Sequence, residues 1–503
     1  MKDSLELGEK ELRPPVVALM GHIDHGKSTL LDYIRKTKIT EGEAGGITQH
    51  VNAYEVTHNQ SKITFIDTPG HEAFTSIRSR GANIADIAIL VVSAEDGVKP
   101  QTIEAYKHIK KSEVPFIVAI TKIDKPSANI ERAKQSLAEN DVYVEGYGGS
   151  ISSVSVSAKT GEGVNELLEM IILLSEVEHF TGDRGRWGSG IVLESRLDPQ
   201  IGIIAVGIIK DGTVRKGMTV ASVGAIAPLR FIQDTEGKEQ KSLSFSSPIQ
   251  MAGWDEAPPA GAMFETFDDK RAAQFYAESE LAKAKAKRSG KESTTHINGD
   301  ENTAILPIII KADVTGSLEA LVYELNKLSH ERIILKIILK GIGTVSENDV
   351  KSAMTTAGTI VFSFNTKIDS QAAALAERSG VPVETFDIIY KLTERINNLL
   401  LEREPKIEVE EITGQGKVLK IFSTTKDKHV IGVRSLSGIF EVGGLLKIIR
   451  RDEEIGRGKI KGLQQNKVEI EKISENSEFG AMIESKTEIA PGDMLEQITK
   501  VTK

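Results

Sequence analysis

A glycine-rich pattern, Gly21-x-x-x-x-Gly26-Lys27-Ser28, stands between an apolar run and a helical pattern. A strand, a glycine-rich loop and a helix in this order are the context in which the pattern binds phosphate. The two glycines let the backbone approach phosphate oxygens, and the N–H groups at the helix start form an anion-binding nest. We therefore expect Lys27 to reach the β- and γ-phosphates of a nucleotide and the Ser28 hydroxyl to bind Mg²⁺.

Two other interpretations of this stretch stay open at this point. The pattern also occurs by chance, and the loop would then be a simple turn with an exposed lysine. His22 and His25 could instead bind a metal, although the chain offers no cysteine to join them. The phosphate interpretation uses the whole loop, which consists of Gly21, His22, Ile23, Asp24, His25, Gly26, Lys27, Ser28 and Thr29.

Length and composition limit the function classes. At 503 residues the chain is expected to form three or four domains. The absence of cysteine excludes disulfides and thiolate metal sites and fits a reducing compartment. The sequence contains no apolar run long enough to cross a bilayer, so we expect a cytoplasmic protein without a membrane partner. Its net charge of −9 means that any RNA contact must use local basic patches, shape or a protein partner.

Two further loops are expected to face the γ-phosphate. In a glycine-rich loop, Thr48 can close over this phosphate and complete the magnesium shell. A strand at 62–66 runs into Asp67, which stands where a second-shell magnesium carboxylate is usual. The Gly70 N–H can bond the γ-phosphate, and His71 is placed to orient the attacking water.

Two later loops are expected to read the base. An apolar strand ends in Thr121-Lys122-Ile123-Asp124, and the Asp124 carboxylate can accept hydrogen bonds from N1–H and N2–H of guanine. Adenine lacks this pair of donors. A backbone N–H in Ser157-Ala158-Lys159 can bond the guanine O6. All four loops fall at strand ends of one predicted parallel sheet, where such sheets bind ligands, and together they predict a site for GTP or GDP with Mg²⁺.

These motifs resemble those of translational GTPases, over residues 14–178. Three segments are most similar to the bacterial initiation factor 2 family: MGHIDHGK at 20–27, AGGITQH at 44–50 and DTPGH at 67–71. The resemblance implies that His71 is the catalytic histidine and that Ile23 and Ile47 flank it as an apolar gate.

One position of the base-reading loop departs from the family. Thr121 stands where the family normally has an asparagine, which braces this loop against the phosphate loop and can contact the guanine N7. Threonine is expected to do part of this, and guanine specificity is expected to survive through Asp124.

Changes in pattern and the resemblance predict a multidomain α/β and β protein with seven segments. These are a flexible leader (1–13), the P-loop GTPase domain (14–178), a β-barrel (186–268), a helix with a flexible linker (269–303), an α/β/α sandwich (304–385), a long connecting helix (386–404) and a C-terminal β-barrel (406–503).

The segment KADVTGSLEAL at 311–321 resembles the third domain of the initiation factor 2 family, a domain that elongation factors lack. The helix at 386–404 has two interpretations, a core helix of this domain or a connection that carries the last domain, and each can hold for one half of the helix. The tetrapeptide at 366–369 repeats the base-reading one, but we interpret it as coincidence because no phosphate loop precedes it.

The resemblance implies that the last barrel binds the acceptor end of initiator tRNA, and Phe422 and Glu478 match the family there. From Lys417 to Lys461 there are 11 basic and 5 acidic residues, which indicates either an RNA-facing patch or a solvated surface. The family's basic-basic-aromatic trio is replaced by Gln464, Gln465 and Asn466. Two cysteines that are common in the family's pocket for the formylated methionine are replaced here by Val433 and Phe479.

Taken with the resemblance, the sequence implies a GTP-hydrolysing translation initiation factor. It would place formylmethionyl initiator tRNA on the 30S subunit and promote joining of the 50S subunit, with hydrolysis stimulated by the ribosome. Other initiation factors are expected partners, and the chain is expected to be a monomer. One alternative is another translational GTPase, against which the third domain argues. The other is a nucleotide-gated RNA-binding protein without hydrolysis, against which His71 argues.

Overall fold

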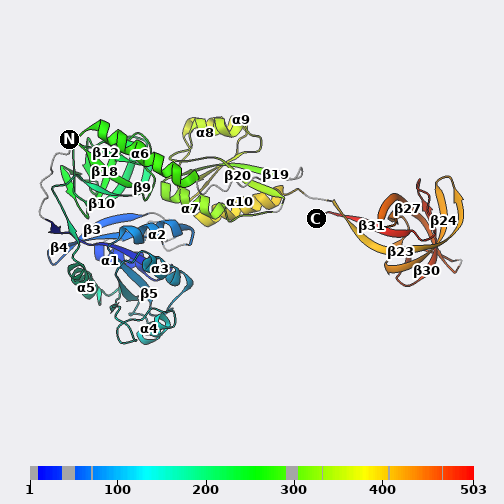
Figure 1. Ribbon diagram of the computed structural model, residues 1–503, viewed down its shortest axis with the longest axis horizontal. Helices are drawn as coiled ribbons and strands as arrows, with labels where there is room; N and C mark the ends of the chain where they lie inside the picture. Colours follow the sequence, from blue (N-terminus) through cyan, green and yellow to red (C-terminus); the bar gives the residue numbers. More distant parts are fainter. Residues whose placement is uncertain are drawn as a thin grey trace. The chain divides into compact units, whose positions relative to one another are not determined.

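The computed structural model describes residues 10–36, 51–69, 72–289, 304–330, 332–405, 408–466 and 468–502, and Figure 1 labels many of its elements. The chain forms two compact units, Met1–Arg403 and Glu404–Lys503. No helix within the described ranges is both long and apolar enough to cross a membrane.

The first domain of the larger unit is built on a six-stranded sheet with the order β3-β4-β2-β5-β6-β7. All pairs are parallel except β3 with β4, and the parallel strands are apolar on both faces because helices cover both. The strands are β2 (Val16–Gly21), β3 (Asn52–His58), β4 (Ser61–Asp67), β5 (Ile87–Ser93), β6 (Phe116–Thr121) and β7 (Ser153–Ser155). The helices are α1 (Lys27–Arg35), η3 (Glu72–Phe74), α2 (Thr75–Ile84), α3 (Pro100–Lys111), α4 (Ile130–Ala138) and α5 (Val164–Val177).

Part of the predicted leader is ordered. Strand β1 (Glu11–Leu12) pairs with β8 (Thr181–Gly182), and Arg13 donates two hydrogen bonds to the Asp86 carboxylate, at 2.5 and 2.7 Å. The prediction of a flexible segment is therefore wrong for residues 11–13, because a buried ion pair and a strand pairing hold them. Residues 1–9 lie outside the described part of the chain.

The second domain is an antiparallel, barrel-like sheet with the order β13-β12-β18-β9-β10-β17-β14-β15. Its core includes Val192, Ala205, Ile249, Trp254 and Phe264. The strands are β9 (Ser189–Asp198), β10 (Gly202–Asp211), β12 (Thr219–Ser222), β13 (Ala225–Pro228), β14 (Ile232–Gln233), β15 (Glu239–Gln240), β17 (Pro248–Trp254) and β18 (Met263–Phe267), with β11 (Thr213–Arg215) and β16 (Ser242–Ser244) pairing beside them. Helix α6 (Lys270–Ser289) follows, and the linker predicted after it lies outside the described residues.

The third domain is a parallel sheet with the order β20-β19-β21-β22. Its strands are β19 (Ala304–Ala312), β20 (Ile333–Ile342), β21 (Ile360–Phe364) and β22 (Val383–Phe386). Helices α7 (Thr315–Leu325) and α10 (Ile389–Arg403) share one core cluster with the sheet, and α8 (Glu347–Met354) and α9 (Ser370–Ser379) share another.

The helix predicted over 386–404 is shorter and belongs to this third domain. Phe386 ends β22, so α10 begins only at Ile389. The apolar stripe of α10, which includes Leu392, Ile396 and Leu399, is buried in the cluster that also contains β19 and β21. The interpretation as a core helix of the third domain therefore holds along the whole of α10.

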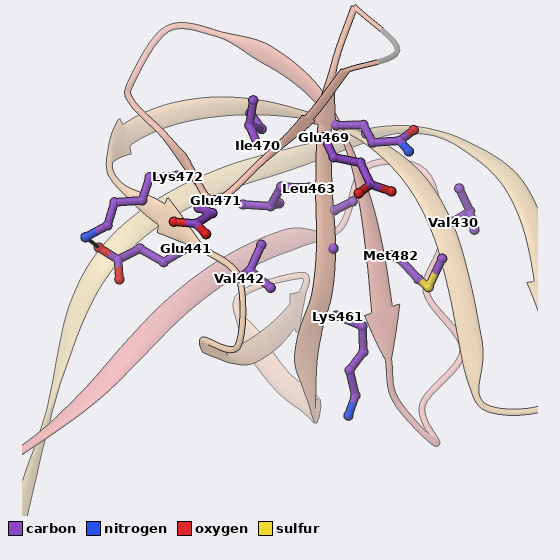
Figure 2. A pocket seen from close by; sticks show the side chains of 14 residues that line it. Val430, Glu441, Val442, Lys461, Leu463, Glu469, Ile470, Glu471, Lys472 and Met482 are labelled. Carbon is purple, nitrogen blue, oxygen red and sulfur yellow. Dashed lines mark hydrogen bonds and ion pairs between the residues drawn. The ribbon is translucent and has the colours of Figure 1, made fainter.

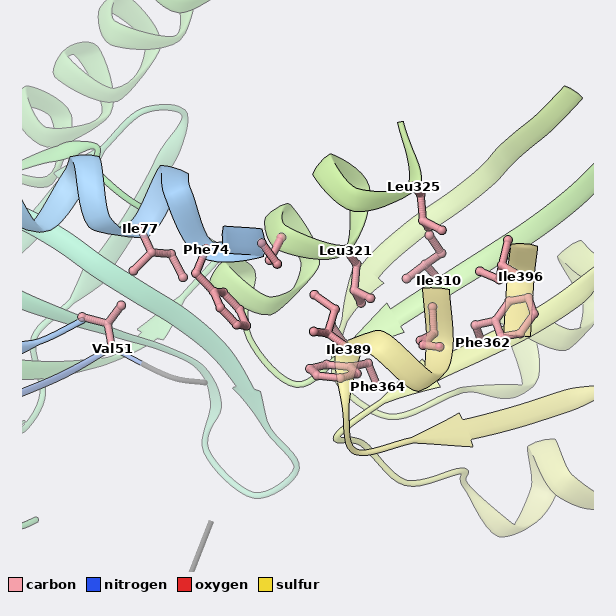
Figure 3. Packing of buried hydrophobic residues seen from close by; sticks show 14 of the residues in the cluster. Val51, Phe74, Ile77, Ile310, Leu321, Leu325, Phe362, Phe364, Ile389 and Ile396 are labelled. Atoms are coloured by element: carbon pink, nitrogen blue, oxygen red, sulfur yellow. The ribbon is translucent and has the colours of Figure 1, made fainter. Parts of the chain in front are cut away.

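The three domains of the larger unit share one hydrophobic core (Figure 3). Phe74 and Ile77, from η3 and α2, lie in the same cluster as Leu321 of α7 and Leu193 of β9. An ion pair of 2.5 Å between Arg80 of α2 and Glu319 of α7 adds to this contact. The segment that follows His71 is thus packed directly against the third domain.

The smaller unit is a closed antiparallel barrel. The strands follow the order β26-β31-β23-β24-β30-β27-β28, and an additional pairing of β26 with β27 closes the ring. They are β23 (Glu408–Thr425), β24 (Lys428–Gly438), β26 (Leu445–Arg450), β27 (Glu453–Gln465), β28 (Val468–Ile470), β30 (Glu478–Glu484) and β31 (Met494–Thr502), with β25 (Phe440–Glu441) pairing with β29 (Lys472–Ile473).

Candidate functional site

The phosphate loop joins β2 to α1, and its two glycines are required by geometry. Gly21 has a φ of +152°, and a Cβ there would lie 2.4 Å from the Val91 carbonyl oxygen. Gly26 adopts the left-handed conformation, with φ +85°, at the N-terminal cap of α1. The loop therefore places backbone close to strand β5 and turns sharply into the helix whose N-terminus faces the loop.

Lys27 is a buried cation at the centre of this loop. The residue is 5% exposed, and its Nζ donates to the carbonyl oxygens of Gly21 (3.0 Å) and His22 (2.5 Å). Burial lowers the pKa of Lys27 to about 8, against the opposing effect of the Asp67 charge. An ammonium group held among carbonyls and helix N–H groups favours an anion, so the loop fits a phosphate group.

Helix α3 supports the phosphate loop through a contact that the loop motif does not predict. The Ile23 N–H donates to Gln101 Oε1 at 3.0 Å. Gln101 lies in the first turn of α3, directly after Pro100 at the helix start. This proline is the sequence signal that could have placed Gln101 near the loop, because proline favours the first helical position.

The two loop histidines pack against each other within the phosphate loop. Their rings contact edge to face, with centroids 4.9 Å apart. The Ser93 N–H donates to His25 Nδ1 at 3.3 Å, and burial, followed by the nearby His22, lowers the pKa of His25 to about 4. No cluster of three potential His, Asp or Glu ligands occurs in the part of the chain that the structure describes. His25 is thus packed against β5, where its burial disfavours the charged form.

Thr121 braces the base-reading loop against the phosphate loop. Its Oγ1 donates to the His25 carbonyl oxygen at 2.5 Å, and the Val92 carbonyl oxygen lies 3.3 Å from the same hydroxyl. This contact is the brace expected of the asparagine that Thr121 replaces. The shorter side chain reaches because His25 belongs to a loop that passes directly beside the end of β6.

Asp124 and Ser157 form the polar end of the candidate base pocket. Ser157 Oγ donates to Asp124 Oδ1 at 2.7 Å, and this hydrogen bond is the main cause of the lowered pKa of Asp124. The Ser157 N–H donates to the Glu162 carbonyl, so the main-chain donors left for a base are those of Ala158 and Lys159. The orienting role of the Ser157 hydroxyl was not expected from the sequence.

Replacing Asp124 by asparagine is expected to shift nucleotide preference from guanine to xanthine. Asparagine presents an N–H₂ donor where guanine offers donors, whereas xanthine has a carbonyl at position 2. We expect GTP affinity to fall by at least about tenfold, since a hydrogen bond to a charged group contributes about 1.5–3 kcal/mol. Competition of GTP and XTP against labelled GDP measures this, and an unchanged preference for GTP would rule out base reading by Asp124.

The described residues around the expected magnesium position offer hard oxygen ligands, which Mg²⁺ prefers. Ser28 follows Lys27 at the start of α1, and Asp67 ends β4 with 8% exposure. Thr68 Oγ1 donates to the Leu19 carbonyl at 2.7 Å, which ties the loop after β4 to β2. Ile47, Thr48, Gly70 and His71 lie outside the described residues.

On the C-terminal barrel, Phe422 and Glu478 both lie at the surface. Phe422 is 64% exposed, and the Lys420 ammonium lies 5.9 Å from the centre of its ring. Glu478 accepts a hydrogen bond from Arg434 Nη2 at 2.5 Å. A large exposed aromatic ring beside a cation is a typical stacking platform for nucleic-acid bases.

Val433 and Phe479, which replace the two cysteines common in the family, are buried in the barrel. They pair across β24 and β30 and are 1% and 5% exposed. The Phe479 ring packs against Phe440 with centroids 5.3 Å apart. Successive side chains of a strand point to opposite faces of the sheet, and the side chains of Val433 and Phe479 are on the face that lies inside the barrel.

The C-terminal barrel also has a pocket of about 790 Å³ (Figure 2). Its wall has apolar parts from Val430, Leu463 and Met482 and includes Gln464, but neither Phe422 nor Glu478. The rim carries a 2.5 Å ion pair between Glu441 and Lys472.

Three family models match the chain in sequence. They are the Elongation factor Tu GTP binding domain over residues 13–176, Elongation factor G domain 2 over 188–267 and Translation-initiation factor 2 over 279–397. Proteins named translation initiation factor IF-2 from Nitratiruptor sp. and Thermotoga petrophila are each 41% identical over 507 residues. The alignments cover 99% and 98% of this chain, and 60% and 72% of those relatives. The solved structure of GDP-bound aIF5B from Aeropyrum pernix is 26% identical, with coverage of 97% and 92% and a TM-score of 0.45.

Proposed function

Because the chain belongs to the translation initiation factor IF-2 family and is a GTP-binding translational GTPase, we propose that it places formylmethionyl initiator tRNA on the 30S ribosomal subunit. It then promotes joining of the 50S subunit in the cytoplasm, and the ribosome stimulates GTP hydrolysis. Other initiation factors are partners, and the chain acts as a monomer. The observation that carries this proposal is the presence, in one chain, of the phosphate loop around Lys27 and a Translation-initiation factor 2 segment.

In the proposed nucleotide site, the described residues bind and orient GTP. Lys27, whose ammonium now bonds the Gly21 and His22 carbonyls, would contact the phosphate oxygens, and Asp124 would read the guanine. Thr121 ties the two loops together through the His25 carbonyl. Ser28 would bind Mg²⁺ directly and Asp67 would support it through water. When bound, Mg²⁺ supplies neutralisation of charge on the β- and γ-phosphates.

Hydrolysis is proposed to proceed by positioning and charge stabilisation, without a covalent intermediate. His71 orients the attacking water, while Thr48 and the Gly70 N–H contact the γ-phosphate. Ile23 and Ile47 flank the histidine as a gate. These roles rest on the motifs and on the family, and the ribosome would set the geometry of His71.

The proposed tRNA site uses the β23–β24 hairpin of the C-terminal barrel. Phe422 would stack on a base of the acceptor end, with Lys420 beside it at a phosphate. Of the 11 basic residues between 417 and 461, several are held in ion pairs, such as Arg434 and Arg457. Cations for which no ion pair occurs within the described residues include Lys426 and Lys428 at the hairpin turn, which favours the RNA-facing interpretation of this patch.

Replacing Phe422 by alanine is expected to weaken the protection of formylmethionyl-tRNA against ester hydrolysis by about tenfold. A stacked base is worth about 1–3 kcal/mol, which sets this magnitude. The measurement follows the hydrolysis rate at increasing protein concentration, for formylmethionyl-tRNA, methionyl-tRNA and an elongator aminoacyl-tRNA. The wild-type chain should protect the formylated species selectively.

The matched control is Phe275→Ala, which removes another exposed ring, 74% exposed, on helix α6 of the other unit. It should leave protection unchanged. If the wild-type chain protects none of the three tRNAs, the proposed role of the C-terminal barrel in initiator binding is contradicted, while the nucleotide site stands.

A further inference from the structure

Arg78 of helix α2 is the largest fully buried side chain in the described part of the protein, with 0% exposure. A guanidinium group stays charged in proteins, so its complete burial requires polar partners. Its Nη2 donates to Glu104 Oε1 at 2.8 Å and to Thr75 Oγ1 at 2.9 Å. Its Nη1 donates to the Pro69 carbonyl oxygen at 3.4 Å.

The last of these contacts reaches the loop between Asp67 and His71. Pro69 directly precedes Gly70 and His71, the two residues proposed to contact the γ-phosphate and the water. Helix α2 holds the same loop at a second point: Gly81 lies so close to Thr68 that a Cβ on Gly81 would be 2.6 Å from Thr68 Cγ2. Helix α2 thus contacts Thr68 and Pro69, the residues shortly before the proposed catalytic histidine.

Glu104 extends this arrangement to α3. It lies three residues after Gln101, so both side chains project from one side of the helix. Gln101 accepts a hydrogen bond from Ile23 of the phosphate loop, and Glu104 accepts one from Arg78. The first turns of α3 therefore hold two loops at once, the one that binds phosphate and the one that leads to His71.

We propose that Arg78 is a positioning residue for GTP hydrolysis, which holds the Pro69 carbonyl relative to α3 directly before Gly70 and His71 in the sequence. This inference rests on the proposed function, because it assigns His71 the orientation of water. Arg78 does not touch the nucleotide in this role. Its planar fork donates to Pro69 and Glu104 simultaneously, which the single point charge of a lysine does not reproduce.

The test is single-turnover GTP hydrolysis with ribosomes for full-length Arg78→Lys, alongside equilibrium binding of GDP. GDP has no γ-phosphate, so a residue that acts only through Gly70 and His71 should leave GDP affinity within about twofold. We expect the hydrolysis rate to fall by about tenfold or more, the factor that corresponds to about 1.4 kcal/mol. Arg78→Met, which removes all donors, should be slower than Arg78→Lys.

Glu104→Gln is the second variant, which keeps Arg78 and decides the matter if the arginine variants fail to fold. It should lower the hydrolysis rate and leave GDP affinity unchanged. Arg132→Lys, on the exposed side of α4, is the matched control and should match the wild type.

The inference is overturned if Arg78→Lys or Glu104→Gln hydrolyses GTP within twofold of the wild type. It is also overturned if GDP affinity falls by the same factor as the rate, because Arg78 would then only stabilise the domain. His71→Ala serves as the reference for complete loss. A wild-type chain that shows no ribosome-stimulated hydrolysis would contradict the proposed function itself, whereas normal wild-type hydrolysis with an unaffected Arg78→Lys contradicts only the role of Arg78.

Discussion

Replacing Lys27 by methionine is expected to weaken the binding of both GTP and GDP by about 100-fold or more. The ammonium group is buried and has carbonyl oxygens as hydrogen-bond partners, so a phosphate group gains a desolvated cation when it enters. Hydrogen bonds to charged groups contribute about 1.5–3 kcal/mol each, and Lys27 is expected to contact two phosphates. Isothermal titration with each nucleotide measures the loss, and Lys107→Met, an exposed lysine of α3, is the control.

The same variant has a second readout in the pH dependence of binding. Burial holds the pKa of Lys27 near 8 in the free protein, and a bound phosphate favours the charged form and raises it. The complex then binds more protons than the free protein above pH 8, so affinity should fall as the pH rises beyond that value. Lys27→Met should lose this dependence and its proton uptake. A wild-type affinity that stays constant from pH 7 to about pH 9.5 would contradict the buried, partly deprotonated lysine.

The positions of the candidate nucleotide loops in the fold could be predicted from the sequence, because each is a short contiguous motif at the end of an apolar strand. Gly21 to Ser28, Asp67 and Asp124 all follow strands of one parallel sheet, so the sheet alone brings them to one edge. The consequence of having threonine at position 121 in place of asparagine could also be predicted. The role of this side chain is one contact with the phosphate loop, which the sequence motif identifies.

Contacts between side chains distant in sequence could not be predicted in this way. Arg78 and Glu104 lie on different helices, and neither position belongs to a motif that names its partner. The inward positions of Val433 and Phe479 follow from strand register, which one sequence specifies only once the strand ends are known. The sequence predicted Arg13 to be part of a flexible leader, because no local pattern reveals a partner that is 73 residues away, as Asp86 is.

Asp86 gives the second large expected effect, a loss of about 3–5 kcal/mol of stability on replacement by asparagine. Its carboxylate accepts hydrogen bonds from Arg13 and from Lys210 Nζ (2.7 Å), and from the Val16 N–H (2.9 Å). Lys210 belongs to the barrel domain, so this cluster joins the first two domains. Asparagine keeps the shape but leaves two cations in a largely buried place, and breaking a buried pair costs about this much.

The pH dependence follows from the shift of the Asp86 pKa. Burial opposes ionisation, but hydrogen bonding from Arg13 and the charges of Lys210 and Arg13 outweigh it, so the pKa lies below its ordinary value of 3.8. The stability that Asp86 contributes is therefore present above about pH 3.8 and is lost as the pH falls through the folded-state value. The difference between the wild type and Asp86→Asn should be large at pH 7 and should diminish in acid.

Urea unfolding followed by tryptophan fluorescence measures the effect, because Trp187 and Trp254 are the two tryptophans of the chain and both stand in or beside the barrel sheet. Asp268→Asn, an exposed carboxylate just after β18, is the matched control and should leave the midpoint unchanged.

Burial lowers the pKa of Lys210 although the charge of Asp86 opposes this shift. Burying this cation therefore costs free energy, and the cluster contributes to stability only through the pairing of Lys210 with Asp86. An unchanged midpoint for Asp86→Asn would mean that Arg13 and Lys210 find water once the carboxylate charge is gone, and that apolar packing alone holds the first two domains together.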